Sequence, residues 1–124
     1  MPGFVTRLLL VTFMLLLPLT SARAETASKP SEELVIDVRS EAEWRQGHLE
    51  NAILIPYDRI GTDIARFTGD KNARLYLYCR SGRRTAIAAK ALTRVGYRNL
   101  VNLGTMENAA RTLKRRIISE TAAP

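Results

Sequence analysis

Hydrophobic and polar positions along the chain predict short strands that alternate with helices. Short apolar runs rich in branched residues and bounded by turn residues are typical of buried strands. Segments in which apolar residues recur at three- and four-residue spacing are typical of helices that bury one face. The predicted strands are 34–38, 52–55, 75–78 and 99–103, and the predicted helices are 41–46, 58–67, 84–95 and 107–118.

Local motifs indicate where these elements begin and end. Ser40 with Glu43 three residues later is a capping box, which starts the first helix, and Gly47 ends it. Gly96 suits the left-handed position that follows the third helix. Two helices are expected to bury one face each, made by Ile60, Ile64 and Phe67 and by Ala110, Leu113 and Ile117.

Most of the predicted strands are apolar on both faces, which is typical of a parallel sheet covered by helices. The sequence therefore predicts an α/β fold with a small parallel sheet of four to five strands between two helical layers. In such sheets ligands bind beyond the carboxyl ends of the strands. Cys79 directly follows the predicted strand 75–78, so it stands where a ligand site is expected.

The first 24 residues read as an export signal and not as part of the fold. Arg7 precedes an apolar run over 8–17, Pro18 interrupts this run, and Ala22-Arg23-Ala24 fits a cleavage site. The run is shorter than the ~20 residues that span a bilayer. We therefore expect a cleaved signal peptide and a periplasmic protein, the alternative being a signal anchor in the inner membrane. The expected organisation is signal 1–24, flexible leader 25–33, domain 34–118 and tail 119–124.

Composition narrows the chemistry. The 124 residues include 19 Lys and Arg against 12 Asp and Glu, a net charge of +7, and only one Cys and one His. Because the signal carries Arg7 and Arg23 and no acid, its removal leaves 17 basic and 12 acidic residues, a charge of +5. One Cys excludes an internal disulfide, and one Cys with one His excludes a structural zinc site. The basic residues form no stripe interleaved with aromatics, so no nucleic-acid partner is expected.

The segment that follows the third strand carries the candidate chemistry. Backbone N–H groups in a tight turn at a helix start are expected to converge on a point beside the sulfur of Cys79. Arg80, Arg83 and Arg84 add positive charge. Both effects favour a thiolate over a thiol, so the pKa of Cys79 is expected to be lowered. The same turn suits an anionic substrate; Gly82 permits its tight geometry, and Thr85 can support it.

Three segments together resemble a known family. They are Leu-Val-Ile-Asp-Val-Arg at 34–39, Gly-His-Leu-Glu-Asn-Ala-Ile-Leu-Ile-Pro at 47–56, and Cys-Arg-Ser-Gly-Arg-Arg at 79–84. In this order and spacing the chain resembles a single-domain rhodanese, a thiosulfate sulfurtransferase, of the small exported phage shock protein E type. The resemblance covers about 34–113. It implies the rhodanese-like three-layer fold.

The resemblance also implies an activity. Cys79 would take sulfur from thiosulfate as a persulfide and pass it to cyanide or a thiol. No metal or organic cofactor is implied, and we expect a monomer. Asp37, Arg39 and His48 are expected to support the site structurally, His48 as a hydrogen-bonding turn residue, and Trp44 is expected in the core. The residues expected to bind the substrate are Arg80, Ser81, Gly82, Arg83, Arg84 and Thr85.

Two departures and two alternatives accompany this interpretation. Gly104-Thr105-Met106 and Ala109 stand where many rhodaneses have a second Gly and a Trp, which affects a pocket wall or the last helix. Glu50-Asn51 stands where Pro-Gly is common.

A non-catalytic sulfur carrier is one alternative. A Cys-dependent phosphatase or arsenate reductase is less favoured, because the Cys-x5-Arg motif of the related phosphatases would need Arg where Thr85 stands.

Overall fold

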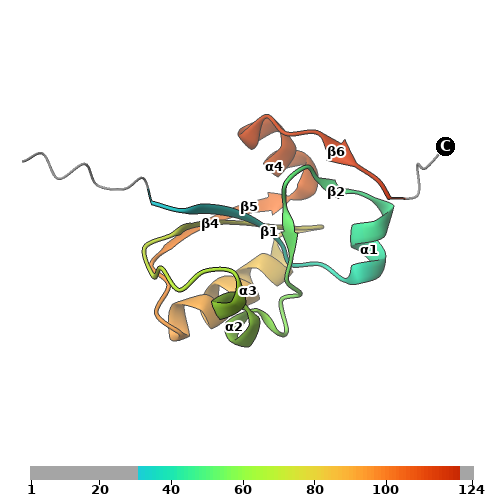
Figure 1. Ribbon diagram of the computed structural model, residues 1–124. Helices are drawn as coiled ribbons and strands as arrows, with labels where there is room; N and C mark the ends of the chain where they lie inside the picture. Colours follow the sequence, from blue (N-terminus) through green and yellow to red (C-terminus); the bar gives the residue numbers. More distant parts are fainter. Residues whose placement is uncertain (1–30, 121–124) are drawn as a thin grey trace, which may run out of the picture.

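The computed structural model describes residues 31–120, in which four parallel strands form a sheet with helices on both faces (Figure 1). The strand order is β3-β1-β4-β5, so β1 and β4 lie at the centre. This confirms the predicted α/β fold with its small parallel sheet. The predicted signal 1–24 and most of the predicted leader lie outside the described residues. The strands are β1 (Glu33–Asp37), β3 (Ile53–Leu54), β4 (Arg74–Cys79) and β5 (Asn99–Thr105).

The two faces of the sheet follow from the alternation of side chains along the strands. In β4, Leu75, Leu77 and Cys79 face one layer, while Tyr76 and Tyr78 face the other. The first layer holds α2 (Ile60–Asp63), the 3-10 turn η1 (Ile64–Arg66) and α3 (Arg83–Arg94). The second layer holds α4 (Met106–Leu113). Helices cover both faces, which accounts for strands that are apolar on both sides.

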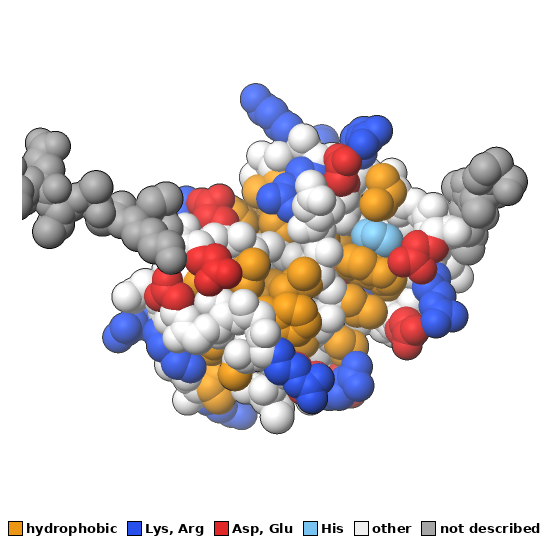
Figure 2. All heavy atoms as spheres, in the orientation of Figure 1, with side chains coloured by type: hydrophobic (Ala, Val, Ile, Leu, Met, Phe, Trp, Pro, Cys, Tyr) orange, Lys and Arg blue, Asp and Glu red, His pale blue; other side chains and the backbone are white. Residues whose placement is uncertain are grey.

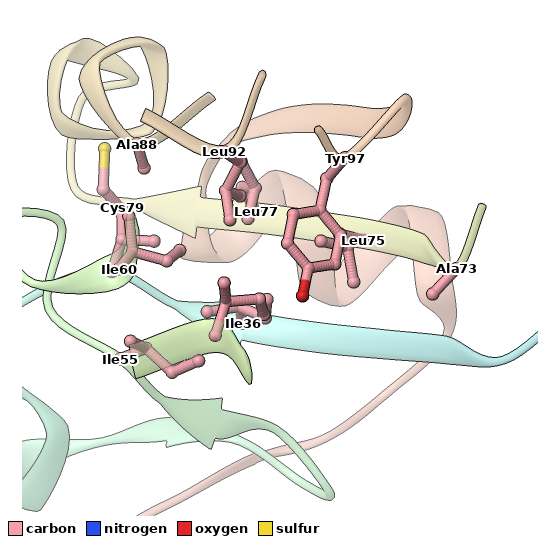
Figure 3. Close-up of a cluster of buried hydrophobic side chains, with 12 residues drawn as sticks. Ile36, Ile55, Ile60, Ala73, Leu75, Leu77, Cys79, Ala88, Leu92 and Tyr97 are labelled. Carbon is pink, nitrogen blue, oxygen red and sulfur yellow. The ribbon is translucent and has the colours of Figure 1, made fainter. Parts of the chain in front are cut away.

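The larger buried cluster lies between the sheet and α3 (Figure 3). Leu92 and Ala88 of α3 are fully buried against β4, and Ile60 of α2 joins them. The smaller cluster, on the α4 side, contains Leu49 and Ala109. Burial of this kind contributes roughly 25 cal/mol per Å² of apolar surface, so these clusters hold the strands in the register that positions Cys79.

A second, small sheet lies at the carboxyl end of the main strands. It pairs β2 (His48–Leu49) antiparallel with β6 (Ile117–Ile118), next to α1 (Glu41–Gln46) and α4 (Figure 1). The capping box of α1 is present: Glu43 N–H donates to Ser40 Oγ, and Ser40 N–H donates to the Glu43 carboxylate. Segments that are distant in sequence therefore meet around the end of β4.

The predicted last helix over 107–118 is too long. The helix ends at Leu113, because Lys114 takes a left-handed conformation with φ 53° and closes the helix with a bond from its N–H to the Ala110 carbonyl. The chain then turns back, and Ile117 pairs with β2 and does not lie on a helical face with Ala110 and Leu113. The β-branched pair Ile117-Ile118 suits a strand better than a helix.

Two other expectations need correction. The predicted helix 58–67 is a single α turn followed by a 3-10 turn, and Phe67 is 42% exposed while Ile60 and Ile64 are buried. Trp44, expected in the core, is half-buried on α1 and stacks on the His48 ring with the ring centroids 3.5 Å apart. Among the described helices, none has the length and apolar character that a membrane crossing requires.

Candidate active site

Cys79 is the last residue of β4, at the carboxyl edge of the sheet. Its side chain belongs to the α3-side cluster and is 0% exposed. Figure 3 shows the sulfur directed away from the strand, beside Ala88 of α3. Three residues, Arg80 to Gly82, then connect the strand to the first turn of α3. This is the strand-to-helix turn that the sequence predicted, with α3 starting one residue earlier, at Arg83.

Gly82 gives the turn its shape. It is the N-cap of α3 and has a left-handed φ of +89°, which side chains with a Cβ rarely adopt. In this conformation its N–H donates a hydrogen bond to Cys79 Sγ with an N···S distance of 2.9 Å. The turn also packs close to β5, since a Cβ at Gly82 would lie 3.6 Å from the Gly104 Cα. Glycine is therefore required here both for conformation and for the direction of the N–H.

Thr85 supports the same turn from within the first turn of α3. Its buried hydroxyl donates to the Gly82 carbonyl at 2.6 Å. Its Oγ1 also lies 3.9 Å from Cys79 Sγ, within reach of the thiol as a hydrogen-bond acceptor. The Gly82 carbonyl also accepts the N–H of Ala86 at 3.2 Å. The threonine thus connects the loop, the helix and the sulfur.

The surroundings of Cys79 favour the thiolate. Burial alone would raise the pKa of this thiol, but hydrogen bonds from the backbone of Thr85, Gly82 and Ser81 outweigh burial, and the pKa is lowered below 9.0. The direction agrees with the sequence-based expectation. The main cause is the backbone of the turn, so the molecule stabilises the anion chiefly with dipoles that the fold fixes in place.

A pocket of about 260 Å³ opens beside Cys79. Its walls come from five places in the fold: the connection from β1 to α1, α1 with the glycine after it, the end of β4 and the turn that follows, the start of α4, and the returning strand β6. Both polar and apolar side chains form these walls. The lining residues are Arg39, Glu43, Gln46, Gly47, Cys79, Arg80, Met106, Glu107 and Ile117.

Arg39 enters this pocket as part of a buried ion pair. Its Nη2 lies 2.7 Å from Asp37 Oδ2 and donates to the Gly47 carbonyl at 2.6 Å. Burial alone would lower the pKa of Arg39, but the hydrogen bonds and charge of Asp37 outweigh burial and raise it. The pair links β1 to the end of α1 and so fixes one wall of the pocket. Asp37 and Arg39, for which structural support was expected, are thus held against each other and against Gly47.

Glu43 and Arg84 form a second ion pair across the site. Arg84 Nη1 donates to Glu43 Oε1 at 2.6 Å and Arg84 Nη2 donates to Oε2 at 2.9 Å. The two bonds lower the pKa of Glu43 to about 2, with Arg84 as the largest cause. Arg84 also lines a neighbouring hollow of about 320 Å³, together with Arg39, Tyr57 and Arg59. The charge of Arg84 is thus matched by a carboxylate.

The other residues expected to bind substrate have different positions. Arg80 is exposed and lines the Cys79 pocket, whereas Arg83 is exposed and lies outside both hollows. Ser81 is exposed, and its backbone contributes to the low pKa of Cys79. Within 31–120, no three His, Cys, Asp or Glu side chains gather closely enough to hold a metal ion.

His48 lies in β2, directly after Gly47 of the pocket wall, and is 6% exposed. Its Nδ1 is 2.9 Å from the Trp44 carbonyl and its ring stacks on the indole. The adjacent Leu49 N–H donates to the Tyr78 hydroxyl at 3.0 Å. The histidine therefore connects α1 to β2.

The sequence did not mark several residues of the pocket. Gln46, Glu107 and Ile117 were not candidate site residues, and Glu43 was noted only as a helix cap. Met106 belongs to a segment that departs from the rhodanese pattern, and that departure was the available signal for this wall. The register explains how α4 reaches the site: Cys79 pairs with Thr105, the N-cap of α4, after a shift in the ladder between β4 and β5.

Comparisons with known proteins agree with this geometry. The family model of the Rhodanese-like domain matches residues 20–107. Thiosulfate sulfurtransferase PspE of Escherichia coli is 35% identical over 75 residues, which are 60% of this chain and 72% of that protein. A sulfurtransferase of Allochromatium vinosum is 33% identical over 70 residues, covering 56% of this chain and 64% of that protein.

A solved structure gives the same result for the fold. A rhodanese with anions from Escherichia coli superposes with a TM-score of 0.64 at 31% sequence identity, over 70% of this chain and 98% of that one. The family match covers well over half of the chain and includes β1, Cys79 and every residue lining the pocket except Ile117. The chain therefore belongs to the Rhodanese-like domain family.

Proposed function

We propose that this protein is a thiosulfate sulfurtransferase that carries sulfur as a persulfide on Cys79. The observation that carries the proposal is the hydrogen bond from the Gly82 N–H to Cys79 Sγ, with an N···S distance of 2.9 Å. The turn lowers the pKa of this thiol, and Cys79 lines an open pocket. A thiolate held by backbone donors is a nucleophile prepared for anionic sulfur chemistry. Relatives named sulfurtransferase and thiosulfate sulfurtransferase support the same reaction.

The first half-reaction forms the persulfide. The Cys79 thiolate attacks the outer sulfur of thiosulfate, a bond forms between Sγ and that sulfur, and the sulfur–sulfur bond of thiosulfate breaks. The electron pair of the broken bond leaves with sulfite. Negative charge stays on the transferred sulfur, where the N–H groups of the turn can stabilise it. Arg80, on the pocket wall, is the cation best placed to attract the donor.

The second half-reaction returns the enzyme to its starting state. An acceptor, cyanide or a thiolate, attacks the outer sulfur of the persulfide, and the bond between that sulfur and Sγ breaks. The electron pair of this bond remains on Cys79 as the thiolate. Splitting the transfer into two displacements at one sulfur replaces a reaction between two anions in solution with two steps at a positively biased site.

Intact mass measurement tests this proposal. The protein treated with thiosulfate and then separated from it is expected to gain about 32 Da, one sulfur, and to lose it on addition of cyanide. Since the chain has one Cys, the gain is assigned to Cys79 without further mapping. Cys79→Ser should show no gain and no thiosulfate:cyanide activity while keeping the circular dichroism spectrum of the parent. A wild-type protein that gains no sulfur would contradict the proposal.

We propose in addition that the protein acts outside the cytoplasm, as a periplasmic enzyme released from its signal. The basis is the sequence of 1–24, with its positive start, apolar run and small residues before position 25. Determining the N-terminal residue of the protein recovered from the periplasm tests this. Glu25 is expected as the first residue, and a full-length chain that remains with the inner membrane would favour a signal anchor.

A further inference from the structure

The charged side chains of the Cys79 pocket fall into two groups. Arg39 is paired with Asp37 and Glu43 is paired with Arg84, so these two contribute little unmatched charge. Arg80 and Glu107 have neither a hydrogen bond nor an ion pair through their side chains with any residue in 31–120. The pocket thus presents one cation and one anion that are available to a ligand.

Arg80 and Glu107 follow the ends of two neighbouring strands of the sheet. Arg80 directly follows Cys79 at the end of β4, and Glu107 lies in the first turn of α4, which directly follows β5. Cys79 is in register with Thr105, two residues before Glu107. The cation and the anion are therefore both set close to the reactive sulfur by the backbone of adjacent strands, and they do not neutralise each other.

Thiosulfate makes use of only one of these charges. A dianion is attracted by Arg80 and repelled by Glu107, so a carboxylate on the wall is a disadvantage for the first half-reaction. An acidic residue in the first turn also favours a helix through the helix dipole. Stabilisation of the helix by Glu107 does not depend on which thiol reacts. A comparison of different thiols therefore distinguishes this role from a role in substrate choice.

We infer that the sulfur acceptor is a small zwitterionic thiol of the amino-acid type. Its carboxylate pairs with Arg80, its ammonium pairs with Glu107, and its carbon chain contacts the apolar wall made by Met106 and Ile117. This inference rests on the proposed sulfurtransferase activity and names the class of its second substrate. Glu107 is then a specificity-determining residue that separates the acceptor from the donor.

The transfer step balances without any other reagent. The acceptor thiol passes its proton to the outer sulfur of the persulfide anion on Cys79. The acceptor thiolate then attacks this sulfur, and a new sulfur–sulfur bond forms. The bond between Cys79 Sγ and the outer sulfur breaks, and its electron pair stays on Sγ. The products are the acceptor persulfide, which keeps the proton, and the Cys79 thiolate, which the Gly82 N–H stabilises.

The test follows the second half-reaction alone. Enzyme loaded with sulfur from thiosulfate is mixed with excess cysteine, cysteine methyl ester or N-acetylcysteine, and loss of the persulfide is followed by rapid quench and intact mass. The transfer rate of each variant is divided by that of the parent for the same thiol. Differences in intrinsic reactivity between the thiols then do not affect the result. Glu107→Gln is expected to slow cysteine and its ester about twofold to fivefold, the size of an exposed ion pair. N-acetylcysteine, which lacks the ammonium, is not slowed.

Arg80→Gln gives the mirror result. Cysteine and N-acetylcysteine, which carry the carboxylate, are slowed about twofold to fivefold, and the methyl ester is not. Two control variants change net charge equally at the other end of the sheet: Glu33→Gln at the start of β1 and Arg98→Gln just before β5. Both should leave the order of the three thiols unchanged. High salt should reduce the preference for cysteine in the parent, because exposed pairs are screened.

Two results would overturn the inference. Equal slowing of all three thiols by Glu107→Gln would assign that residue a helical role only. A parent protein that reacts with N-acetylcysteine as readily as with cysteine, after correction for thiolate fraction, would exclude zwitterion recognition. Both results leave the proposed function intact, because the persulfide still forms; only a parent that never gains sulfur removes the proposed function, and the inference with it.

Discussion

At the scale of single residues, the reactivity of Cys79 is determined by where a few N–H groups point. The sequence suggested that backbone N–H groups of the turn and the arginines after Cys79 both lower its pKa, and the direction is right. The dominant stabilising partners, however, are the backbone groups of Thr85, Gly82 and Ser81. Fixed dipoles at a short distance act more strongly on a buried atom than exposed charges that water screens.

Thr85 offers a test of whether the hydrogen bonds of the turn set the pKa of Cys79. Thr85→Val keeps the volume of a buried side chain and leaves the Gly82 carbonyl bonded to the Ala86 N–H. It removes the hydroxyl that lies 3.9 Å from Cys79 Sγ, which can turn to donate to the thiolate. We expect the pKa of Cys79 to rise toward 9.0, so that alkylation by iodoacetamide at neutral pH slows about twofold to fivefold.

The pH dependence of this alkylation shows in which direction the pKa of Cys79 changes. The parent pKa lies below 9.0, so its alkylation rate reaches half of its plateau at a pH below 9.0 and falls as the pH drops through that value. The Thr85→Val midpoint should lie at higher pH, while the plateau rate at high pH stays the same. Thr93→Val, which removes a hydroxyl at the far end of α3, serves as the control. Identical midpoints in parent and Thr85→Val would contradict the assigned role.

At the scale of elements, the Glu43–Arg84 pair joins α1 to the first turn of α3. Each side chain is about one quarter exposed, and the two bonds are parallel and short. Glu43 also accepts from the N-cap of its own helix. One carboxylate therefore holds three parts of the site: the start of α1, the start of α3 and one wall of the pocket.

Glu43→Gln measures what this connection contributes. The variant keeps an oxygen for the cap but loses the charge that pairs with Arg84, and we expect the free energy of unfolding at neutral pH to fall by about 1 to 2 kcal/mol. The KM for thiosulfate should fall as well, because the pocket loses a negative charge and Arg84 is released. Glu41→Gln, whose partner Arg45 is largely exposed, should cost less than about 0.5 kcal/mol.

The pH dependence of this contribution follows from the pKa of Glu43, which lies at about 2, below its ordinary 4.5. A lowered carboxyl pKa contributes stability that is complete above pH 4.5 and is lost as the pH falls toward 2. The difference in unfolding free energy between parent and Glu43→Gln, measured in urea, should therefore shrink steadily from pH 5 to pH 3. A difference that stays constant over this range would show that the ion pair is not its source.

The local pattern predicted some parts of these elements and not others. The capping box, the glycine after α3 and the strand that ends at Cys79 follow from neighbouring residues, and all three are present. The pairing of Glu43 with Arg84 spans 41 residues, and no local rule selects that arginine over Arg80 or Arg83. Which arginine is neutralised depends on how α1 packs beside α3, and this is a property of the tertiary fold.

At the scale of the whole molecule, the parallel sheet was predictable because most of its strands are short and apolar on both faces. The closing of the pocket was not. It depends on a chain reversal at Lys114 and on β6 pairing with β2, two elements of two residues each. So short a strand carries little sequence signal, and a basic segment between apolar residues resembles a continuing helix. Charges of both signs are spread over the face of the molecule shown in Figure 2.

The segment 114–120, here named the C-terminal strap, gives the pocket its last wall. Its Ile117 lines the pocket, and its hydrogen bonds reach two other elements. The Arg116 carbonyl accepts the Glu50 N–H at 2.9 Å, and Glu120 accepts from the Trp44 indole at 3.3 Å. Because Ile117 and Ile118 remain 45% and 40% exposed, the strap adds only modest burial.

Truncation separates the strap's effect on the pocket from its effect on folding. A chain that ends at Lys114 loses β6, and we expect the free energy of unfolding to fall by about 2 kcal/mol, from two half-buried isoleucines and their hydrogen bonds. A chain that ends at Glu120 keeps every strap contact named above and should match the parent.

Loss of the strap is expected to affect the rates of the two half-reactions differently. Persulfide formation from thiosulfate depends on the Cys79 turn, and the strap hydrogen bonds named above go to Glu50 and Trp44, outside that turn, so its rate should change less than about twofold. Transfer to a thiol acceptor, which needs the apolar wall at Ile117, should slow by about fivefold or more for the loss of one apolar contact surface. Rapid-quench mass measurement of each half-reaction, with both truncated chains shown to be folded by circular dichroism, distinguishes the two. Equal slowing of both half-reactions would mean that the strap supports the Cys79 turn itself and not the acceptor wall.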